Sequence, residues 1–468
     1  MLFSSMTFLF VFMPLVMVVY FLSKKEIRNY VLLIASIIFY AWGEPRYLAI
    51  MIITILVNYA GAILLDKHYS SRQRLWIVSL TIVLDLSFLF YFKYFNFVVD
   101  NINGVLATDF QLLDVIMPIG ISFYTFQAMS YLIDVYRREV PAQKDVYKLA
   151  LYIVLFPQLV AGPIVKYHDV CEQIDNRTIE FKNVIIGFKR FITGLAKKVL
   201  IANTLAEVVD KIFAQAPENL TTGVSWLGAV AYCLQLYYDF SGYSDMAIGL
   251  GLMFGFRFLE NFNYPYISKS ITEFWRRWHI SLATWFKLYL YIPLGGNRKG
   301  AVRTYWNLFA VFLVTGIWHG AAWSYVAWGI WNGIFIVIER FFGLDKDKNG
   351  RWYVSAAKHV YAFFAIVWGM IIFRAESLSY AYEYICRMLH IDVTKHLPDY
   401  DYGVNNKFAI MLIVGLICAM PVCRNLIYIK YEHKVQRTLV NIWLFLLFFW
   451  STISLAASTY NPFIYFRF

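Results

Sequence analysis

The sequence predicts an all-α polytopic membrane protein, on the strength of its composition, its apolar runs and its basic loops. Of the 468 residues, 60% are hydrophobic and only 15% are charged, whereas soluble domains carry about 25% charged residues. A transmembrane helix needs about 20 apolar residues, so a chain of this length accommodates about 11 spans with their connections. Basic loops alternate with loops poor in Lys and Arg, as the positive-inside rule requires.

Composition also argues against two other kinds of site. The five cysteines form no Cys-x-x-Cys pair and no cluster with metal-ligand spacing, so neither a disulfide framework nor a metal site is expected. The net charge of +12 is explained by the cytoplasmic loops of a membrane protein, and no nucleic-acid partner is expected.

Apolar runs in the first third of the chain predict spans at about 2–22, 30–42, 47–65, 75–99 and 112–135. The connections after the first, third and fifth runs are basic, whereas the other two are neutral or lack Lys and Arg. This alternation places the N-terminus outside the cell and the basic loops in the cytoplasm. The first run lacks the basic start and the cleavage site of a signal peptide, so we expect it to be retained.

A shorter apolar segment, Leu151–Val165, is broken by Pro157, Gly162 and a second proline, and basic residues flank it on both sides. It is too short and too broken to span a membrane. We therefore expect a re-entrant segment, which is tolerated only where protein or water satisfies its backbone. A similar Pro-Gly break lies in Met117–Gln127.

The rest of the chain predicts further spans around a cationic centre. They are a span that ends near Asn203, Val224–Phe256, a hairpin at Trp306–Arg340, and spans at about 355–373, 407–423 and 438–456. The segment 257–304 is cationic and interrupted, which predicts short interfacial helices at the cytoplasmic surface. No linker divides the chain, so residues 1–468 are expected to form one membrane domain.

The first candidate for chemistry is a histidine inside an apolar run. His319 lies in a segment without a charged residue between Arg303 and Glu339, and such a residue is a functional-site hypothesis. A neutral imidazole in a dry site can act as a general base. It can also be a core histidine in a tight helix contact, because Gly316 and Gly320 are four residues apart.

A second histidine, His279, lies among cations. Repulsion from its basic neighbours is expected to keep the imidazole neutral, although the residue also fits an interfacial aromatic belt. The cations and a Gly-Gly-Asn turn suit the phosphates of a nucleotide-bearing donor, or alternatively anionic lipid headgroups. The candidate donor-binding residues are Arg276, Arg277, Trp278, Lys287, Asn297, Arg298 and Arg303.

A polar stripe interrupts the predicted span Val224–Phe256. Buried acids in spans usually face a cavity or a cation, and Arg257 and the cations of 276–303 are plausible partners. Together with two polar residues of the hairpin, the stripe supplies candidates for lining a substrate passage. They are Gln235, Asp239, Ser241, Asp245, Trp318 and Asn332.

Two long stretches carry a family resemblance: YYDFSGYSDMAIGLGLMFGFRFLENFNYPYISKSITEFWRRWHISLATWFKLYLYIPLGGNRKG and TGIWHGAAWSYVAWGIWNG. FYAWGEPRY, MPIGISFYTFQAMSYLIDVYRRE, FPQLVAGPIVKY and WGMIIFRAES support them. Together they resemble the membrane-bound O-acyltransferase (MBOAT) family, closest to its branch of bacterial alginate O-acetyltransferases. The resemblance implies a ring of helices around a cytoplasmic and an extracytoplasmic funnel. His319 corresponds to the family's essential histidine and His279 to its second active-site position.

The resemblance also implies a reaction in the cell membrane of a bacterium. The donor is an acyl thioester on the cytoplasmic side, with acetyl-CoA favoured as substrate and no bound cofactor. His319 would take a proton from the acceptor hydroxyl, and His279 would position or polarise the donor. The acceptor would be an extracytoplasmic polysaccharide, as in alginate and other exopolysaccharide O-acetylation. A secreted or membrane-anchored acetyltransferase partner is plausible, because this chain contains no GxSxG motif.

Two other functions stay open. One is a D-alanyl transferase acting on teichoic acid, or an acyltransferase for another glycan, a lipid or a protein. Its donor would be a carrier-protein thioester, which lacks the nucleotide of CoA. The other is a transporter or proton channel that uses His319 as a relay. Transporters often show paired inverted halves, and the sequence contains no such repeat.

Overall fold

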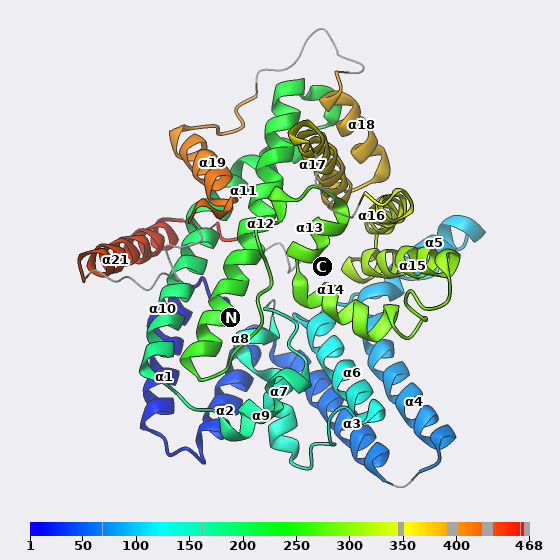
Figure 1. Ribbon diagram of the computed structural model, residues 1–468, viewed down its shortest axis with the longest axis vertical. Helices are drawn as coiled ribbons and strands as arrows, with labels where there is room; N and C mark the ends of the chain where they lie inside the picture. Colours follow the sequence, from blue (N-terminus) through cyan, green and yellow to red (C-terminus); the bar gives the residue numbers. More distant parts are fainter. Residues whose placement is uncertain are drawn as a thin grey trace. The chain divides into compact units, whose positions relative to one another are not determined.

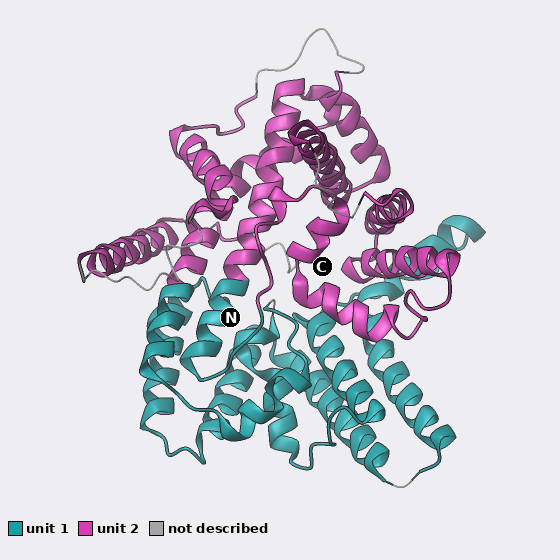
Figure 2. Ribbon diagram, viewed as in Figure 1, with its two compact units in different colours: residues 1–191, 244–259 teal, residues 192–243, 260–468 magenta. Residues whose placement is uncertain are grey.

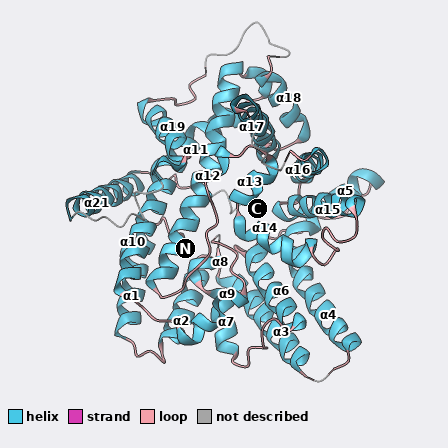
Figure 3. Ribbon diagram, viewed as in Figure 1, coloured by secondary structure: helices cyan, strands magenta, loops and turns pink. Residues whose placement is uncertain are grey.

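The computed structural model describes residues 1–67, 69–160, 162–344, 351–390, 400–423, 434–458 and 460–462. Within these ranges all regular elements are helical (Figure 3), as the sequence predicts. The chain divides into two compact units (Figure 2). Unit 1 comprises Met1–Phe191 and Ser244–Leu259, and unit 2 comprises Ile192–Tyr243 and Glu260–Phe468.

Several helices match the predicted spans, which confirms the polytopic membrane class. Among the described residues, four are long and apolar enough to cross a membrane: Pro45–Asp66, Ser71–Leu106, Trp352–Arg374 and Val435–Ala457. Three shorter apolar helices cover Phe8–Leu22, Arg28–Ala41 and Asn406–Cys418. The total of about 11 spans stays a prediction, because a span is defined by a membrane as well as by helix length.

Unit 1 consists mainly of helices from the first part of the chain (Figure 1). They are α1 (Met13–Leu22), α2 (Arg28–Ala41), α3 (Leu48–Asp66), α4 (Ser71–Leu89), α5 (Phe95–Leu106), α6 (Ile121–Arg137), α7 (Val146–Val154), α8 (Phe156–Leu159) and α9 (Tyr167–Asn176). Helices α10 (Phe181–Ala196) and α12 (Thr222–Met253) contribute to both units. Inside unit 1, the Nδ2 atom of buried Asn58 donates to both carboxylate oxygens of Asp85 at 2.9 and 3.0 Å, which joins α3 to α4.

Two Pro-Gly breaks meet inside unit 1. The span predicted at 112–135 becomes helical only at Ile121, because Gly120 has a φ of +77° and ends the preceding irregular segment. A Cβ atom at Gly120 would lie 2.9 Å from the backbone oxygen of Leu159, so this close approach requires glycine. The predicted broken segment Leu151–Val165 is likewise interrupted, since α7 ends at Val154 and α8 is a single short turn.

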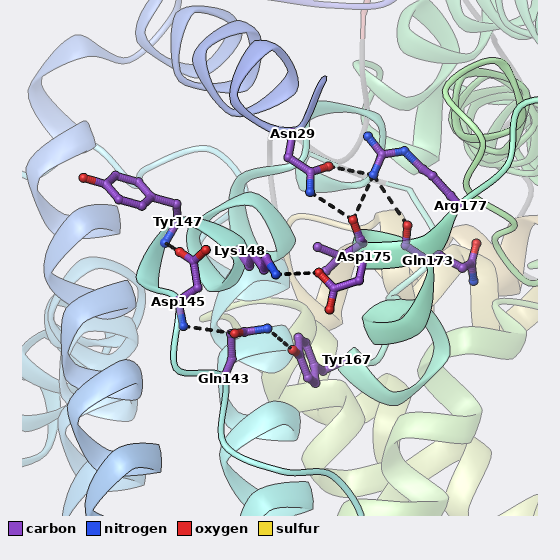
Figure 4. A network of polar contacts seen from close by, with 10 residues as sticks. Asn29, Gln143, Asp145, Tyr147, Lys148, Tyr167, Gln173, Asp175 and Arg177 are labelled. Atoms are coloured by element: carbon purple, nitrogen blue, oxygen red, sulfur yellow. Dashed lines mark hydrogen bonds and ion pairs between the residues drawn. The ribbon is translucent and has the colours of Figure 1, made fainter. Parts of the chain in front are cut away.

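A polar network joins the loops of unit 1 (Figure 4). The Nη1 atom of Arg177 donates to Oδ1 of Asn29 at 2.6 Å, and its Nε atom donates to the backbone oxygen of Phe254 at 3.1 Å. Nearby, Lys148 and Asp175 form an ion pair at 2.7 Å. The network holds α2, α7, α9 and the end of α12 together within the unit.

Unit 2 contains the end of α10, most of α12 and the later helices (Figure 1). They are α11 (Asn203–Phe213), α13 (Ile271–Arg277), α14 (Ile280–Phe286), α15 (Ala301–His319), α16 (Trp323–Phe342), α17 (Trp352–Arg374), α18 (Leu378–Met388), α19 (Asn406–Cys418) and α21 (Lys434–Ala457). The short helices α13 and α14 confirm the interrupted helical segment predicted within 257–304.

Helices α15 and α16 form the predicted hairpin, and two glycines bring them into contact. A Cβ atom at Gly316 would lie 2.9 Å from the Cα atom of Gly329. Because real Cβ atoms essentially never come so close, the two helices can touch here only through glycine. The small-residue spacing seen in the sequence therefore serves helix packing, and it also fixes the end of α15.

A buried carboxylate on α16 holds the start of α13. Glu339 is 0% exposed and accepts hydrogen bonds from the backbone N–H groups of Ile271 at 2.5 Å and Thr272 at 2.8 Å. The hydroxyl of Tyr361 on α17 donates to the same carboxylate at 3.1 Å. Because the first N–H groups of a helix lack partners within the helix and favour negative charge, this contact anchors α13 on α16 and α17.

Candidate active site

The first predicted histidine ends α15 within the tight hairpin. His319 is its last residue, and the extended Gly320 that follows stops the helix. Its imidazole is 5% exposed and lies against the rings of Trp328 and Phe373, each with a centroid 5.1 Å away and nearly perpendicular. Trp318 adds a third aromatic contact at 5.0 Å. Aromatic side chains from α15, α16 and α17 thus surround the imidazole.

The second predicted histidine occupies a strained turn between α13 and α14. His279 is 1% exposed and has a φ of +44°, a conformation that costs a residue other than glycine about 1–3 kcal/mol. The turn is held by the backbone, since Ile280 N–H donates to the backbone oxygen of Asn261 at 2.9 Å. The imidazole of His279 lies 4.5 Å from the ring of Phe240 on α12 in an edge-on contact. Strain maintained by this much packing is typical of functional sites.

The imidazole of His279 has one hydrogen-bonded nitrogen and one without a bond. Its Nδ1 atom lies 3.1 Å from Oδ1 of Asn261. Its Nε2 atom is buried and has no hydrogen-bond partner among the described residues. A buried polar atom left in this state costs about 1–3 kcal/mol, so a substrate or water is the natural partner for Nε2.

Burial, rather than the adjacent arginines, keeps His279 neutral. Burial lowers the pKa of His279 well below its usual range, and the positive charge that His319 can carry lowers it further. The expected repulsion from neighbouring arginines is not among the causes, and Arg277 pairs with Glu273, its Nη2 atom 2.8 Å from the carboxylate.

Both histidines are linked to one face of α16. Trp328, Asn332 and Glu339 lie at helical spacing on that face. The indole nitrogen of Trp275 on α13 donates to Oδ1 of Asn332 at 3.0 Å, and its ring meets that of Trp328 at 5.4 Å. Trp328 also contacts the ring of His319. The same face of α16 therefore packs against His319 at the end of α15 and against α13, the helix that leads into His279.

The polar stripe of α12 is divided between the units. In unit 2, Asp239 pairs with Lys198, with 2.6 Å between Oδ1 and Nζ and both side chains almost completely buried. Asp245 belongs to unit 1, where its carboxylate lies 2.7 Å from a guanidinium nitrogen of Arg190. The partners suggested from sequence, Arg257 and the cations of 276–303, are therefore wrong for both acids.

The remaining stripe candidates are buried. Gln235 and Ser241 on α12 are 4% and 2% exposed, and Oε1 of Gln235 and Oγ of Ser241 have no hydrogen-bond partner among the described residues. Buried polar atoms of this kind fit the lining of a passage for polar substrates. That role stays a prediction.

The candidate donor-binding residues fall into two groups. Trp278 is buried, with its ring stacked on Phe274 at 5.4 Å, and Arg277 is taken up by Glu273. These contacts hold the two side chains in place, and their part in donor binding stays a prediction. The others are exposed: Arg276, Lys287, Asn297, Arg298 and Arg303. The Gly-Gly-Asn turn beside them is fixed by buried Asn307, whose Nδ2 atom donates to the backbone oxygen of Gly296 at 2.9 Å.

Sequence reasoning missed the residues that orient the two histidines. Asn261 and Phe373 lie far from them in the chain, and nothing in their own composition marks them. The signal available was position: Asn261 falls in LENFNYPY and Phe373 in WGMIIFRAES, two of the stretches that carry the family resemblance. Lys198, the partner of Asp239, was missed in the same way.

Comparison with known proteins gives a consistent result. Residues 37–380 match the model of the membrane-bound O-acyltransferase family. The chain is 42% identical over 500 residues to the probable alginate O-acetylase of Pseudomonas putida, with all of both chains covered. It is 32% identical over 479 residues to the peptidoglycan O-acetyltransferase of Helicobacter pylori, covering 92% of this chain and 89% of the relative. A teichoic acid D-alanyltransferase of Bacillus subtilis is 28% identical over 284 residues, which covers 55% of this chain and 69% of the relative.

Proposed function

This chain belongs to the membrane-bound O-acyltransferase family, and we propose that it transfers an acetyl group from cytoplasmic acetyl-CoA to an extracytoplasmic polysaccharide. Acyl transfer to a hydroxyl group is the activity of the family. The observation that carries the finer proposal is the presence in unit 2 of two buried histidines, one in contact with Trp328 and the other following the helix whose Trp275 packs on the same Trp328. Similarity to an alginate O-acetylase along the whole chain supports acetyl as the acyl group and a polysaccharide as the acceptor.

In this proposal His319 is the general base. It removes the proton of the acceptor hydroxyl as the oxygen attacks the thioester carbonyl. The aromatic rings around it exclude water, which would otherwise hydrolyse the thioester. Since Trp328 and Phe373 contact the ring from two helices, the imidazole needs little reorganisation to react.

The donor side is formed by α13, α14 and the turn that follows them. The exposed Arg276, Arg298 and Arg303 offer charge to the phosphates of acetyl-CoA. The Glu339 contact supports this role, because it fixes the start of α13 and so the direction in which its cations project. His279, at the end of the same helix, orients the reacting groups.

We infer the setting from charge and family. The basic loops lie in the cytoplasm, the N-terminus outside, and residues 1–468 act as one domain in the inner membrane of a bacterium. The acceptor polysaccharide is reached directly or through a secreted or membrane-anchored acetyltransferase. Capture of such a protein by the purified chain would support the second route.

The test is acetyl transfer by the purified protein in lipid nanodiscs. Acetyl-CoA labelled in the acetyl group is supplied with alginate oligosaccharides or peptidoglycan fragments, and labelled polymer is counted. Wild type and the control His359→Ala, which changes an exposed histidine on α17, are expected to transfer label. His319→Ala and His279→Ala are expected to fail. Acetyl transfer by His319→Ala at the wild-type rate would show that His319 is not the general base.

A D-alanyl transferase is the second candidate within the family. It is favoured by the match to a teichoic acid D-alanyltransferase, although that match covers only about half of this chain. Supplying a D-alanyl thioester on a carrier protein in place of acetyl-CoA separates the two. A proton channel or transporter, the candidate from another class, would carry a flux across proteoliposomes without any donor.

A further inference from the structure

We propose that Asn261 is a positioning residue that fixes the tautomer of His279, so that His279 acts as a proton acceptor through Nε2. This inference rests on the proposed acetyl transfer for its role, although the tautomer itself can be tested without it. It narrows the part of His279, which cannot then polarise the thioester carbonyl by donating a hydrogen bond.

The side-chain oxygen of Asn261 lies between Ser281 and His279. Oδ1 accepts a hydrogen bond from the backbone N–H of Ser281 at 3.2 Å and from the Ser281 hydroxyl at 2.9 Å. A backbone N–H can only donate, so the atom that faces it is the amide oxygen and not the amide nitrogen. The same oxygen lies 3.1 Å from Nδ1 of His279. The Ser281 hydroxyl also lies 3.4 Å from Nδ1, but it donates to Oδ1 of Asn261 at the shorter distance of 2.9 Å. An amide oxygen beside an unprotonated nitrogen would place two lone pairs against each other, so Nδ1 carries the proton.

The packing around His279 restricts rotation of its imidazole. Asn261 is 1% exposed, and its backbone oxygen also accepts from the N–H of Ile280. The side chain and the main chain of Asn261 therefore both hold the turn at His279. Rotation of the ring to exchange its nitrogens would meet Phe240, whose ring lies 4.5 Å away.

The chemical consequence falls on the other nitrogen. A neutral imidazole has one protonated nitrogen, so Nε2 carries a lone pair. This atom is buried without a partner among the described residues. It is therefore available to accept a proton, in the way that a base oriented by a third group is used in acyl transfer.

A relay follows in which atoms and charge balance. The acceptor oxygen forms a bond to the thioester carbonyl carbon, the carbon–sulfur bond breaks, and His319 takes the hydroxyl proton. Nε2 of His279 receives that proton from His319 and returns it to the thiolate sulfur of CoA. Both imidazoles end neutral. Throughout, Nδ1 of His279 keeps its proton and donates it in a hydrogen bond to Oδ1 of Asn261.

Charged groups occur on the helices that pack near His279. His319 of α15 is the titratable group that acts on it. On α13, Arg277 is paired with Glu273, and on α12, next to Phe240, Asp239 is paired with Lys198. A carboxylate introduced at position 261 would place its negative charge directly beside Nδ1 of His279, where Oδ1 of Asn261 now lies.

The direct test is nuclear magnetic resonance of protein with ring-¹⁵N-labelled histidine in nanodiscs. The chain has eight histidines, and loss of a signal in His279→Gln identifies the one of interest. Wild type is expected to show a neutral ring protonated at Nδ1 at pH 7. Ser281→Ala, which keeps the Asn261 contact, is expected to show the same ring. A wild-type ring protonated at Nε2 would overturn the proposal, whatever the activity.

The activity test uses Asn261→Asp, which keeps an acceptor oxygen for Ser281 but adds a negative charge. A carboxylate on Nδ1–H stabilises the imidazolium, so the pKa of His279 rises. The acidic limb of the kcat/KM profile should move to higher pH, with activity recovered in alkali. Asn176→Asp, which adds a charge at an exposed site of unit 1, should leave the limb in place.

The outcomes separate the two levels of the argument. If wild type transfers no acetyl group, the proposed function fails while the resonance result still decides the tautomer. If wild type transfers acetyl and Asn261→Asp is folded but unshifted, the relay through His279 is wrong. A purely structural role for Asn261 would lower the amount of folded protein and leave the pH limb unchanged.

Discussion

The polar network of unit 1 and the histidine site of unit 2 differ in whether their polar atoms have hydrogen-bond partners. Around Arg177, polar side chains pair with other protein groups (Figure 4), as in the bond from Arg177 to Asn29 and the ion pair of Lys148 with Asp175. In unit 2, Nε2 of His279 and polar atoms of Gln235 and Ser241 on α12 are buried without a hydrogen-bond partner among the described residues.

The bonded groups of the network stabilise the fold, whereas the partnerless atoms of the histidine site can bond to a substrate. A satisfied network stabilises the loops it joins, because its hydrogen bonds replace those made to water. Unsatisfied buried atoms cost about 1–3 kcal/mol each, and a substrate that bonds to them removes this cost. The site in unit 2 is therefore less stable than its packing alone would allow.

The largest effect should come from the base. His319→Ala is expected to lower acetyl transfer by about 10²–10⁴-fold, the usual worth of general-base catalysis. The midpoint of thermal unfolding should fall only in proportion to the lost aromatic contacts of the ring, which are far too few to account for such a loss of rate. Single-turnover rates and unfolding curves measured on the same preparation check both halves. A variant that loses activity only in proportion to folded protein would give His319 a structural role.

The next largest effect should come from the buried ion pair of unit 2. Lys198→Met removes the buried cation 2.6 Å from the carboxylate of Asp239, and breaking such a pair costs about 3–5 kcal/mol of unfolding free energy. Chemical unfolding in detergent measures it. The double variant Lys198→Met with Asp239→Leu should recover most of the loss, since an apolar pair replaces a buried ionic pair at little cost. Failure of that recovery would mean that Asp239 has a task beyond pairing.

A smaller effect on stability, with none on chemistry, should come from the unit 1 network. Arg177→Met removes charge-assisted hydrogen bonds and should lower the unfolding free energy by about 2 kcal/mol. The rate per folded molecule should stay at the wild-type value. A large fall in kcat would break the contrast, because it would give the satisfied network a part in catalysis.

The smallest effect should come from single exposed cations. Arg298→Ala is expected to raise KM for acetyl-CoA about two- to fivefold, as exposed charge contacts contribute about 0.2–1 kcal/mol. The value of kcat should be unchanged, and added salt should reduce the difference. Titration of acetyl-CoA at two salt concentrations measures both quantities. Equal KM values for dephosphorylated and intact CoA thioesters would argue against phosphate contacts there.

The same contrast explains what the sequence could predict. His319 was found because a titratable residue in an apolar run is conspicuous, and the hairpin because its glycines repeat at helical spacing. The break before α6 was visible in Pro118 and Gly120, although the predicted span began too early. Apolar periodicity alone does not show where such a helix starts.

Pairings across the fold were not predictable in this way. The partners of Asp239 and Asp245 come from one helix, α10 with its continuation, and those residues carry no signal beyond their charge. Asn261 looks like any polar residue in a loop, and its role depends on a turn at His279 with positive φ. The neutrality of His279 was predicted with the wrong cause, because burial was invisible when only neighbours in sequence were considered.

The most direct measurement is a sided assay in proteoliposomes. Acetyl-CoA labelled in the acetyl group is added on the face that carries the basic loops, and an oligosaccharide acceptor is trapped on the other face. The proposed function predicts labelled oligosaccharide inside and free CoA outside for wild type, and neither for His319→Ala. Labelled acetyl-CoA recovered intact inside, or transfer only when donor and acceptor share one face, would contradict it.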